Sequence, residues 1–306
     1  MLKDKFNRTY NYLRVSLTHR CNFSCNYCNK LKSPIKELNT SQLLDIVEKL
    51  ISLCSIKKVR LTGGEPLLRE DIDYIISRIN RNVNDIGITT NGYFLKERIL
   101  SLYKSGLKRI NISLDSLNRN RFKKITNTDY FNRVIDSIIS ALSYGLKVKI
   151  NSVLVKGLDY KEIDKFIKFS QSYNITIRFI ELMPFSNEYA NKMFLPASYV
   201  INYIEKKYKI DKTYNEGVAK IFEIKNAKIG FITSISTPFC SLCNRLRLTS
   251  DGKLYRCLFD KNFIDLSKSI NDFNDEIIKN YLYLKKEKHN VDYNSKVSNS
   301  IRVIGG

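Results

Sequence analysis

The chain has 306 residues, and 43% of them are hydrophobic, which is enough for a substantial buried core and excludes extensive disorder. Its 52 lysines and arginines against 30 aspartates and glutamates give a formal net charge of +22. One large α/β domain, with or without a compact second one, is the expected organisation. No apolar run approaches the roughly 20 residues of a membrane-spanning helix. The N-terminal residues also lack the apolar stretch of a secretory signal, so we expect a cytoplasmic protein with no membrane partner.

The excess of positive charge has two interpretations. It can serve an anionic partner, such as nucleic acid or a phosphorylated small molecule. It can also reflect composition, because lysine, asparagine and isoleucine are abundant along the whole chain. No block of five or more consecutive basic residues is present. We therefore attribute most of the excess to composition and expect no nucleic-acid partner.

Strand-like runs alternate with helical patterns over the first 182 residues. Strands are predicted at residues 12–17, 58–62, 85–90, 108–114, 146–155 and 175–182. Helices, with apolar residues at spacings of three and four, are predicted at residues 40–53, 71–81, 95–104, 131–143 and 160–172. Alternating β and α units indicate a parallel sheet with right-handed crossovers, and six units are fewer than the eight of a closed barrel. The predicted fold is therefore α/β, an open partial (β/α)6 barrel of the TIM type.

The pattern changes after Pro184. The later elements predicted are a helix over residues 196–208, a hairpin of residues 218–224 and 228–234, and a polar helix over residues 273–288. We therefore predict a barrel domain over residues 1–190 and a smaller C-terminal domain over residues 191–306 that helps to close the barrel.

Six of the seven cysteines form two groups of three, which lie more than 200 residues apart: Cys21, Cys25 and Cys28, then Cys240, Cys243 and Cys257. The odd total argues against a disulfide framework. The seventh, Cys54, ends an apolar helical pattern and is predicted to be a buried thiol. Three thiolates on one loop can ligate three irons of a [4Fe–4S] cluster and leave the fourth iron open to an exchangeable ligand.

Zinc is the alternative metal, but a structural zinc site needs four ligands. His19 is the only histidine near the first cysteine group, and it precedes the loop. For the second group His289 is available in principle, but it follows a charged stretch and is predicted to be solvated. The cysteines alone therefore favour iron–sulfur clusters and leave zinc open.

The first cysteine group follows the first predicted strand, and its Cys-x3-Cys-x2-Cys spacing with an aromatic at Tyr27 is specific. It resembles the signature of radical S-adenosylmethionine (SAM) enzymes, in which the open iron binds the amino and carboxylate groups of the cofactor. The sequence Thr-Gly-Gly-Glu-Pro at residues 62–66 resembles the Gly-Gly-Glu-Pro motif of the same superfamily. Its glycines also let the backbone approach a ligand closely.

Two arginines follow the second cysteine group. Strand alternation places Arg245 and Arg247 on one face, and Leu246 and Leu248 on the other. Guanidinium groups suit phosphate. The pair therefore indicates an anionic substrate next to a second cluster with an open iron.

Nearly the whole chain resembles the MoaA family of GTP 3′,8-cyclases, which act first in molybdenum cofactor biosynthesis. Besides both cysteine groups, the resemblance rests on residues 62–67, 89–92, 113–116, 178–181 and 305–306. Two departures are visible. His19 stands where the family usually has an acidic residue, and the region before Cys240 is shortened. Neither departure touches a proposed ligand.

The resemblance implies two [4Fe–4S] clusters, one at each cysteine group. SAM is implied to contact the first cluster and Tyr27, Gly64, Ser113 and Met183. GTP is implied to lie between the clusters, with its guanine on the open iron of the second. Its implied contacts are Arg14, Arg60, Thr89, Lys149, Arg245, Leu246 and Arg247, where Leu246 contributes its backbone and Arg178 is a weaker candidate.

Arg14 is further assigned a catalytic role, because by this resemblance it lies near both clusters and can assist the final reduction. The strand patterns, read without the family resemblance, support part of these assignments. Arg14 and Lys149 each interrupt an otherwise apolar strand. A cation that faces a barrel interior needs a partner, and a triphosphate provides one.

The implied reaction begins when a 5′-deoxyadenosyl radical removes hydrogen from C3′ of GTP. The C3′ radical attacks C8 of guanine, and one electron and one proton complete 3′,8-cyclo-7,8-dihydro-GTP. The cofactors carry the difficult chemistry, while the protein positions the substrate and excludes water. The implied partners are a flavodoxin- or ferredoxin-like reductant and a downstream cyclic pyranopterin monophosphate synthase. A homodimer is one possible assembly.

Two alternative functions each fit part of the sequence. A peptide-modifying radical enzyme with auxiliary clusters usually has more C-terminal cysteines than the three present here. A zinc-containing nucleic-acid-binding protein would suit the charge of +22. It lacks identifiable fourth ligands, however, and leaves residues 63–66 unexplained.

The last six residues, Ile-Arg-Val-Ile-Gly-Gly, are apolar around one arginine. A terminal Gly-Gly is usually a frayed end. The family resemblance extends to these glycines, however, and implies a tail inserted into the active site. We therefore predict that the tail docks.

Overall fold

The computed structural model describes residues 2–28, 35–185, 187–268, 274–295, 297 and 300–305. The first half of the chain forms six parallel strands: β1 (Tyr12–Ser16), β2 (Lys58–Thr62), β3 (Asp85–Thr90), β4 (Arg109–Ser113), β5 (Lys147–Leu154) and β6 (Thr176–Glu181). Their connections contain the helices α1 (Thr40–Cys54), α2 (Ile72–Asn80), α3 (Leu95–Lys104), α4 (Arg119–Thr126), α5 (Phe131–Ser143) and α6 (Tyr160–Tyr173). The predicted strands and helices are confirmed to within one residue at each end.

Local sequence accounts for several element boundaries. Asn39 caps α1, because its side chain accepts a hydrogen bond from the Gln42 amide and the Gln42 side chain accepts one from the Asn39 amide. Sequence reasoning missed α4, a short helix capped by Asn118, because its exposed face is strongly basic and only three of its residues are buried.

The second half of the chain adds strands at both edges of the sheet. At one edge β10 (Arg245–Leu248) pairs in parallel with β1, followed by β11 (Lys253–Tyr255) and β12 (Ile264–Asp265). At the other edge β9 (Ala227–Ile232) pairs in parallel with β6, followed by β8 (Ala219–Ile224) and β7 (Lys212–Glu216). The result is one 12-stranded sheet that ends in β12 and β7.

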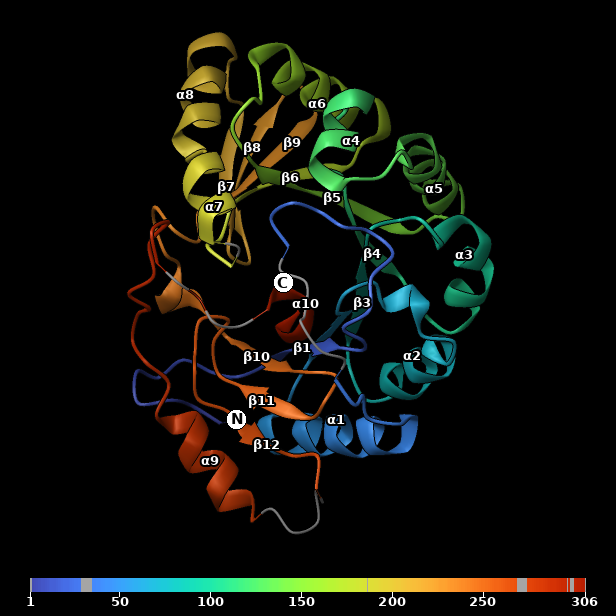
Figure 1. Ribbon diagram of the computed structural model, residues 1–306, viewed down its shortest axis with the longest axis vertical. Helices are drawn as coiled ribbons and strands as arrows, with labels where there is room; N and C mark the ends of the chain where they lie inside the picture. The colour runs from blue at the N-terminus through green and yellow to red at the C-terminus, as the bar shows by residue number, and fades with distance from the viewer. Residues whose placement is uncertain are drawn as a thin grey trace.

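This sheet curves around a central space and is not closed, with the helices α1 to α6 and α8 along its outer side (Figure 1). The prediction of an open partial barrel is confirmed. Both edges of the barrel sheet are built from C-terminal strands. The division at residue 190 stays a prediction.

The remaining short elements are η1 (Pro66–Leu68), α7 (Asn187–Met193), α8 (Ala197–Lys207), η2 (Cys240–Leu242), α9 (Asp275–Tyr283) and α10 (Ile301–Ile304). The β8–β9 turn is formed by Lys225 and Asn226, with φ of 46° and 70°. Helix α9 ends at Tyr283, so the predicted extension to residue 288 is wrong. Its predicted start, Phe273, lies outside the described residues.

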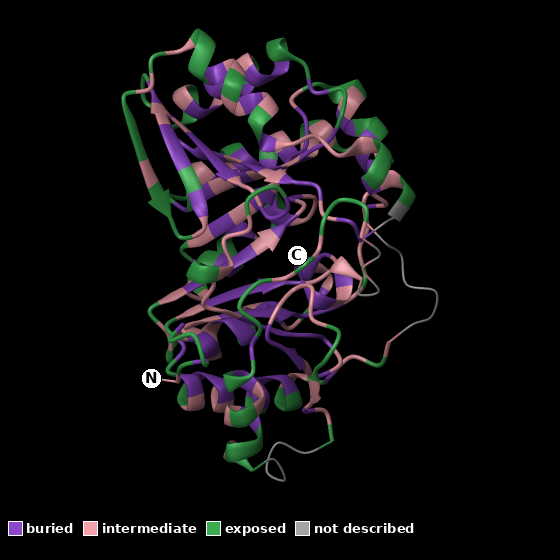
Figure 2. Cartoon of the chain, turned by 90° about the vertical axis from the view of Figure 1, so that its left-hand side faces the viewer, coloured by how far each residue is buried: buried purple, intermediate pink, exposed green. Residues whose placement is uncertain are grey.

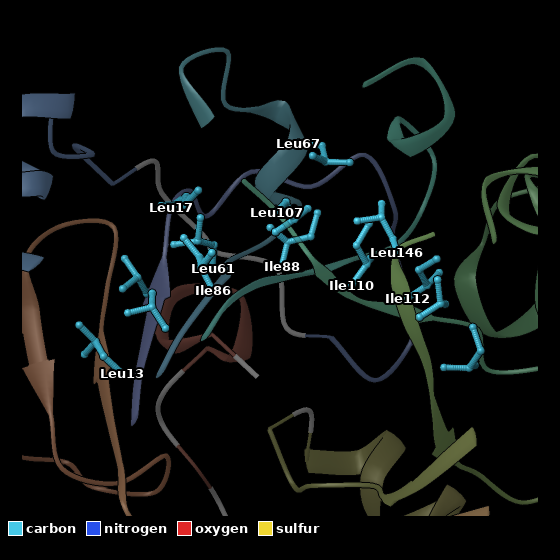
Figure 3. Packing of buried hydrophobic residues seen from close by; sticks show 14 of the residues in the cluster. Leu13, Leu17, Leu61, Leu67, Ile86, Ile88, Leu107, Ile110, Ile112 and Leu146 are labelled. Carbon is cyan, nitrogen blue, oxygen red and sulfur yellow. The ribbon is translucent and has the colours of Figure 1, made fainter. Parts of the chain in front are cut away.

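The main core lies between the sheet and the outer helices. Alternate strand residues are buried and apolar, and those of β1 to β4 pack in a continuous row, as Figure 3 shows for Leu13, Leu61, Ile88 and Ile110. Burying one such side chain contributes about 1.5–3 kcal/mol. The burial view shows the same division, with buried strands inside and exposed residues on the outer helix faces (Figure 2). Cys54 belongs to this core and is fully buried, as predicted.

None of the helices among the described residues has the length and apolar character needed to cross a membrane.

Candidate active site

Parallel pairing places polar side chains at matched positions on neighbouring strands. Arg14 of β1 lies opposite Arg60 of β2 on one side and Arg247 of β10 on the other. Further along the sheet, Asn111 of β4 lies opposite Lys149 of β5. Residues paired in register project from the same face of a sheet. All five line one interior cavity.

This cavity has a volume of about 300 Å³ and a strongly positive wall. Glu216 is the one carboxylate among the lining residues that the structure describes. The lining also includes ten cationic side chains: Arg14, Lys58, Arg60, Arg109, Lys147, Lys149, Arg178, Arg245, Arg247 and Arg256. Such a concentration of one sign of charge in a concave site attracts a polyanion.

The crowded cations perturb one another. Burial lowers the pKa of Arg247 to about 9, and the nearby guanidiniums of Arg14 and Arg245 lower it as well. Burial likewise lowers the pKa of Arg178 to about 10. These shifts report charged groups that lack water and repel their neighbours. A bound anion would relieve both effects.

Several of the cations already have defined partners. Arg60 makes a bidentate pair with Asp85, at 2.9 and 3.0 Å. Lys149 pairs with Glu216, and Arg178 Nη2 donates to Asn111 Oδ1 at 2.7 Å. These contacts fix the orientation of the positive wall before any ligand binds.

The second cysteine group lines the same cavity. Cys240 opens η2, and the Cys243 amide donates to the Cys240 carbonyl at 3.1 Å. Lys285, which is buried, approaches the Cys243 sulfur to 3.5 Å through its Nζ. Burial alone would raise the pKa of Cys243, but Lys285 and Arg245 outweigh it and lower the pKa of this thiol. The thiolate form that binds metal is thereby favoured.

His289 also lines this cavity and packs against Phe259, with ring centroids 4.5 Å apart. It is half-buried, and burial lowers its pKa. The prediction that it is solvated is therefore wrong, because the chain beyond α9 turns inward instead of continuing as an exposed helix.

The first cysteine group occupies the loop after β1. The Cys28 amide donates to the Cys25 carbonyl at 3.0 Å. Two N–H groups face its sulfurs: the Phe23 amide lies 3.4 Å from Cys21 Sγ, and Arg302 Nε lies 3.1 Å from Cys28 Sγ. Burial raises the pKa of Cys21 to about 11 and raises that of Cys25 and Cys28.

The C-terminal tail contacts the first cysteine loop and the arginines of β1 and β10. Helix α10 lies inside the barrel, beside β1 (Figure 1). Its Arg302 contacts Cys28, as above, and donates to the Phe23 carbonyl at 3.0 Å. Just beyond the helix, the Gly305 carbonyl accepts from Arg14 Nε at 3.3 Å and from Arg247. The tail therefore docks as predicted as far as Gly305, and Gly306 lies outside the described residues.

Two of the predicted SAM contacts, Tyr27 and Gly64, lie in the first cysteine loop or against it. Tyr27 donates its hydroxyl to Asp115 Oδ2 at 2.6 Å. A Cβ on Gly64 would collide with the Arg20 carbonyl, so this glycine is required where the motif after β2 packs against the loop backbone. Ser113 ends β4, and Met183 lines the cavity. Their contact with SAM stays a prediction.

Two predicted GTP contacts, Thr89 and Leu246, are described but are not among the lining residues of the cavity. Thr89 pairs in register with Asn111, whose side-chain amide donates to Thr89 Oγ1 at 3.3 Å. The Leu246 side chain is fully buried in the core, and the contact of its backbone with GTP stays a prediction. Sequence reasoning missed Lys58, Arg109, Lys147 and Arg256. The first three could have been found by applying strand alternation to the residues two positions from Arg60, Asn111 and Lys149.

The cysteine thiols of each group, together with the polar groups around them, fit an iron–sulfur cluster. Each group supplies three thiols and keeps N–H or ammonium donors beside its sulfurs, an arrangement that tunes cluster potentials. Among the described residues, no three His, Cys, Asp or Glu side chains are grouped to hold a single ion. A cluster differs from such a site, because each of its irons takes one thiolate.

Comparison with protein families matches nearly the whole chain. The radical SAM superfamily matches residues 15–170, and the family described as Molybdenum Cofactor Synthesis C matches residues 175–291. The first match begins within β1, ends within α6 and includes the first cysteine group, and the second begins just before β6 and includes the other cysteine group. The chain is therefore a radical SAM protein with a molybdenum cofactor synthesis C-terminal region.

Curated relatives narrow this class. A GTP 3′,8-cyclase of Aquifex aeolicus is 40% identical over 90% of each chain, and one of Clostridium botulinum is 39% identical over 99% of each chain. Molybdenum cofactor biosynthesis protein 1 of Dictyostelium discoideum is 40% identical, and this chain spans 46% of its length. The chain belongs to the GTP 3′,8-cyclase family.

Solved structures agree on the fold. Streptococcus suis SuiB bound to S-adenosylmethionine superposes with a TM-score of 0.67 over 90% of this chain and 67% of SuiB, at 17% identity. The protein anSMEcpe with bound AdoMet gives a TM-score of 0.57 over 90% of this chain and 84% of its own, at 15% identity. The shared feature is the open α/β barrel.

Proposed function

We propose that this chain converts GTP into 3′,8-cyclo-7,8-dihydro-GTP as a radical SAM enzyme with one [4Fe–4S] cluster at each cysteine group. The observation that carries the proposal is the cavity that combines the second cysteine group with ten cations and one carboxylate. When bound, the first cluster and SAM supply a 5′-deoxyadenosyl radical that removes hydrogen from C3′ of GTP. A flavodoxin- or ferredoxin-like reductant and a downstream cyclic pyranopterin monophosphate synthase complete the proposed context.

In this proposal the chain's own residues bind and orient the nucleotide. Arg245 and Arg247 project from β10 beside the second cysteine group, and Arg14 adjoins Arg247 in register. Guanidiniums in this arrangement can hold phosphate oxygens bidentately. Arg60, fixed by Asp85, adds a charge with a defined position. The main role of the protein is to orient the ribose of GTP toward the first cysteine group.

The tail completes the enclosure of the site. The Gly305 carbonyl contacts Arg14 and Arg247, and Arg302 contacts Cys28. These contacts support a tail that extends from the first cysteine group to the arginines of β1 and β10, where it can exclude water from the substrate. Arg14 remains our candidate for assisting the final reduction, because it contacts the tail at Gly305 and lies in register with Arg247.

Removing either arginine of β10 should weaken GTP binding selectively. Arg245→Ala and Arg247→Ala each delete a charge-assisted contact worth about 1.5–3 kcal/mol, or about 10- to 150-fold in affinity. SAM affinity should stay within about twofold, because its predicted contacts lie elsewhere. Calorimetry with the surface variant Arg78→Ala as control checks this. Unchanged GTP affinity in both β10 variants would refute the assignment.

GTP binding should also weaken with rising pH. Burial alone would raise the pKa of Tyr12, but Arg14, Arg245, Arg60 and Lys58 lower it to about 8. Below that pH the phenol is neutral, and above it the phenolate adds a negative charge that repels a triphosphate. Affinity should fall between about pH 7 and about pH 9, and Tyr12→Phe should flatten that fall. Parallel pH profiles for the two proteins would contradict the role given to Tyr12.

Anaerobic purification tests the proposed function. We expect a brown protein with about eight irons, which consumes GTP and SAM and releases 5′-deoxyadenosine when reduced with dithionite. A colourless, zinc-containing protein that leaves GTP unchanged would refute it.

A further inference from the structure

A groove on the outside of the molecule reaches the loop of the first cysteine group. It has a volume of about 500 Å³ and lies between α4, the segment after β5, and α7. Asn26, which is exposed and directly follows Cys25, forms part of its wall. The groove therefore brings a protein surface to within one residue of a proposed cluster ligand. It is distinct from the interior cavity, with which it shares no lining residue.

Helix α4 is joined directly to the cysteine loop. The amides of Ser24 and Asn26 donate to the carbonyls of Thr126 and Ile125, at 3.3 and 2.9 Å. The Asn26 side chain donates to the Lys124 carbonyl at 2.7 Å. The carboxyl end of α4 and the loop between Cys21 and Cys28 thus form one hydrogen-bonded unit, and the loop passes beneath α4 in Figure 1.

The groove has an apolar floor and a positive rim. Ile125 and Val155 are buried beneath it and pack with Tyr27 of the cysteine loop in a small separate core. Lys124 and Lys156 are exposed at the rim. Neither ammonium lies within ion-pairing distance of a carboxylate in the described part of the chain, and no carboxylate is among the described lining residues. An apolar centre with a charged rim is the usual anatomy of a protein interface.

We propose that this groove is the docking surface for an acidic, low-potential electron-carrier protein that reduces the first cluster. The inference rests on the proposed function, which requires one electron at that cluster. The carrier loses one electron, the cluster gains it, and no proton or other group is transferred. The interior cavity cannot serve as this entry, because in the proposed function it holds GTP. Positive rim charges match an acidic carrier and would accelerate its association.

The test uses a purified flavodoxin, fully reduced, and the anaerobic holoenzyme. The double variant Lys124→Glu/Lys156→Glu reverses the rim charge without removing any backbone bond between α4 and the loop. Lys104→Glu/Lys108→Glu is the matched control, since both residues are exposed, with Lys104 at the end of α3 and Lys108 directly before β4, and the first cysteine loop follows the other end of the parallel strands. Flavodoxin affinity is measured by calorimetry, and cluster reduction by stopped-flow absorbance.

We expect the rim variant to lower flavodoxin affinity and the reduction rate by about tenfold or more at low salt. The difference should shrink between about 0.05 M and about 0.5 M salt. The control pair should stay within about twofold of wild type, and dithionite-driven turnover should be unchanged in all three proteins. Lys124→Gln/Lys156→Gln should give an intermediate loss.

Equal flavodoxin affinity in the rim variant and the control would overturn the proposal while leaving the proposed function intact. A rim variant that changes the sedimentation of the protein, but not its flavodoxin kinetics, would show that the groove is a contact between two copies of this chain and would also overturn it. Absence of dithionite-driven turnover in wild type would instead refute the proposed function.

Discussion

Cys243→Ala is expected to abolish GTP cyclisation while the first cluster and SAM cleavage persist. Cys243 lies in the cationic cavity, whereas the first cysteine group lies on the loop after β1. Loss of the second cluster would remove the proposed anchor of the guanine, and positioning of this kind is worth at least about 10³-fold in rate. Chromatography of 5′-deoxyadenosine and cyclised GTP, with iron analysis falling from about eight to about four, measures both effects.

Cys54→Ala is the matched control for this prediction. Cys54 is fully buried in α1, away from both groups, and burial raises the pKa of its thiol to about 12. Its removal should cost about 1 kcal/mol of stability and leave both clusters and cyclisation intact. A Cys243→Ala protein that keeps its fold but loses both clusters would contradict the separate roles of the two groups.

Deleting Gly305 and Gly306 is expected to cause a steep loss of GTP cyclisation, at least about 10²-fold. The Gly305 carbonyl contacts Arg14 and Arg247. Deletion leaves Arg302 and its contact with Cys28 in place. Both clusters, SAM binding and thermal stability should therefore change little. A synthetic peptide of the last several residues, added in excess, should restore part of the activity, and full-length rates in the truncated protein would show that the tail has no role.

A single substitution makes the tail test sharper. Gly305 has φ of 73°, and a Cβ there would lie 2.5 Å from Thr62 Cγ2. Gly305→Ala should therefore displace the tail and reproduce the deletion. Gly145 has the same φ of 73° but open space around it, so Gly145→Ala reports backbone strain alone. Equal activity losses in the two variants would mean that strain, not the tail's position, is responsible.

Local sequence patterns predicted much of this structure. The six strands were predictable because their buried alternate residues are apolar, as Leu13 and Val15 are around Arg14. The cysteine groups were recognisable because each lies within one short stretch of sequence. Strand alternation also predicted that Arg14 and Lys149 face the interior of the barrel, because both lie between buried apolar neighbours.

Contacts between distant segments were not predictable in the same way. The bond from Arg302 to Cys28 joins residues 274 apart, and nothing local to either residue specifies it. The pairing of β10 with β1 is equally non-local, so the alignment of Arg247 with Arg14 emerged only from the structure. Helix α4 was not predicted because its buried face is short, with Phe122 and Ile125 as the buried apolar residues among basic ones, although the helix borders the cysteine loop.

The most direct test of the central claim is hydrogen transfer from the ribose of GTP. The anaerobic holoenzyme is reduced with dithionite and supplied with SAM and with GTP deuterated at C3′, and the products are analysed by mass spectrometry. The account predicts one deuterium in 5′-deoxyadenosine and its loss from the cyclised nucleotide. Unlabelled 5′-deoxyadenosine formed together with unchanged GTP would contradict it.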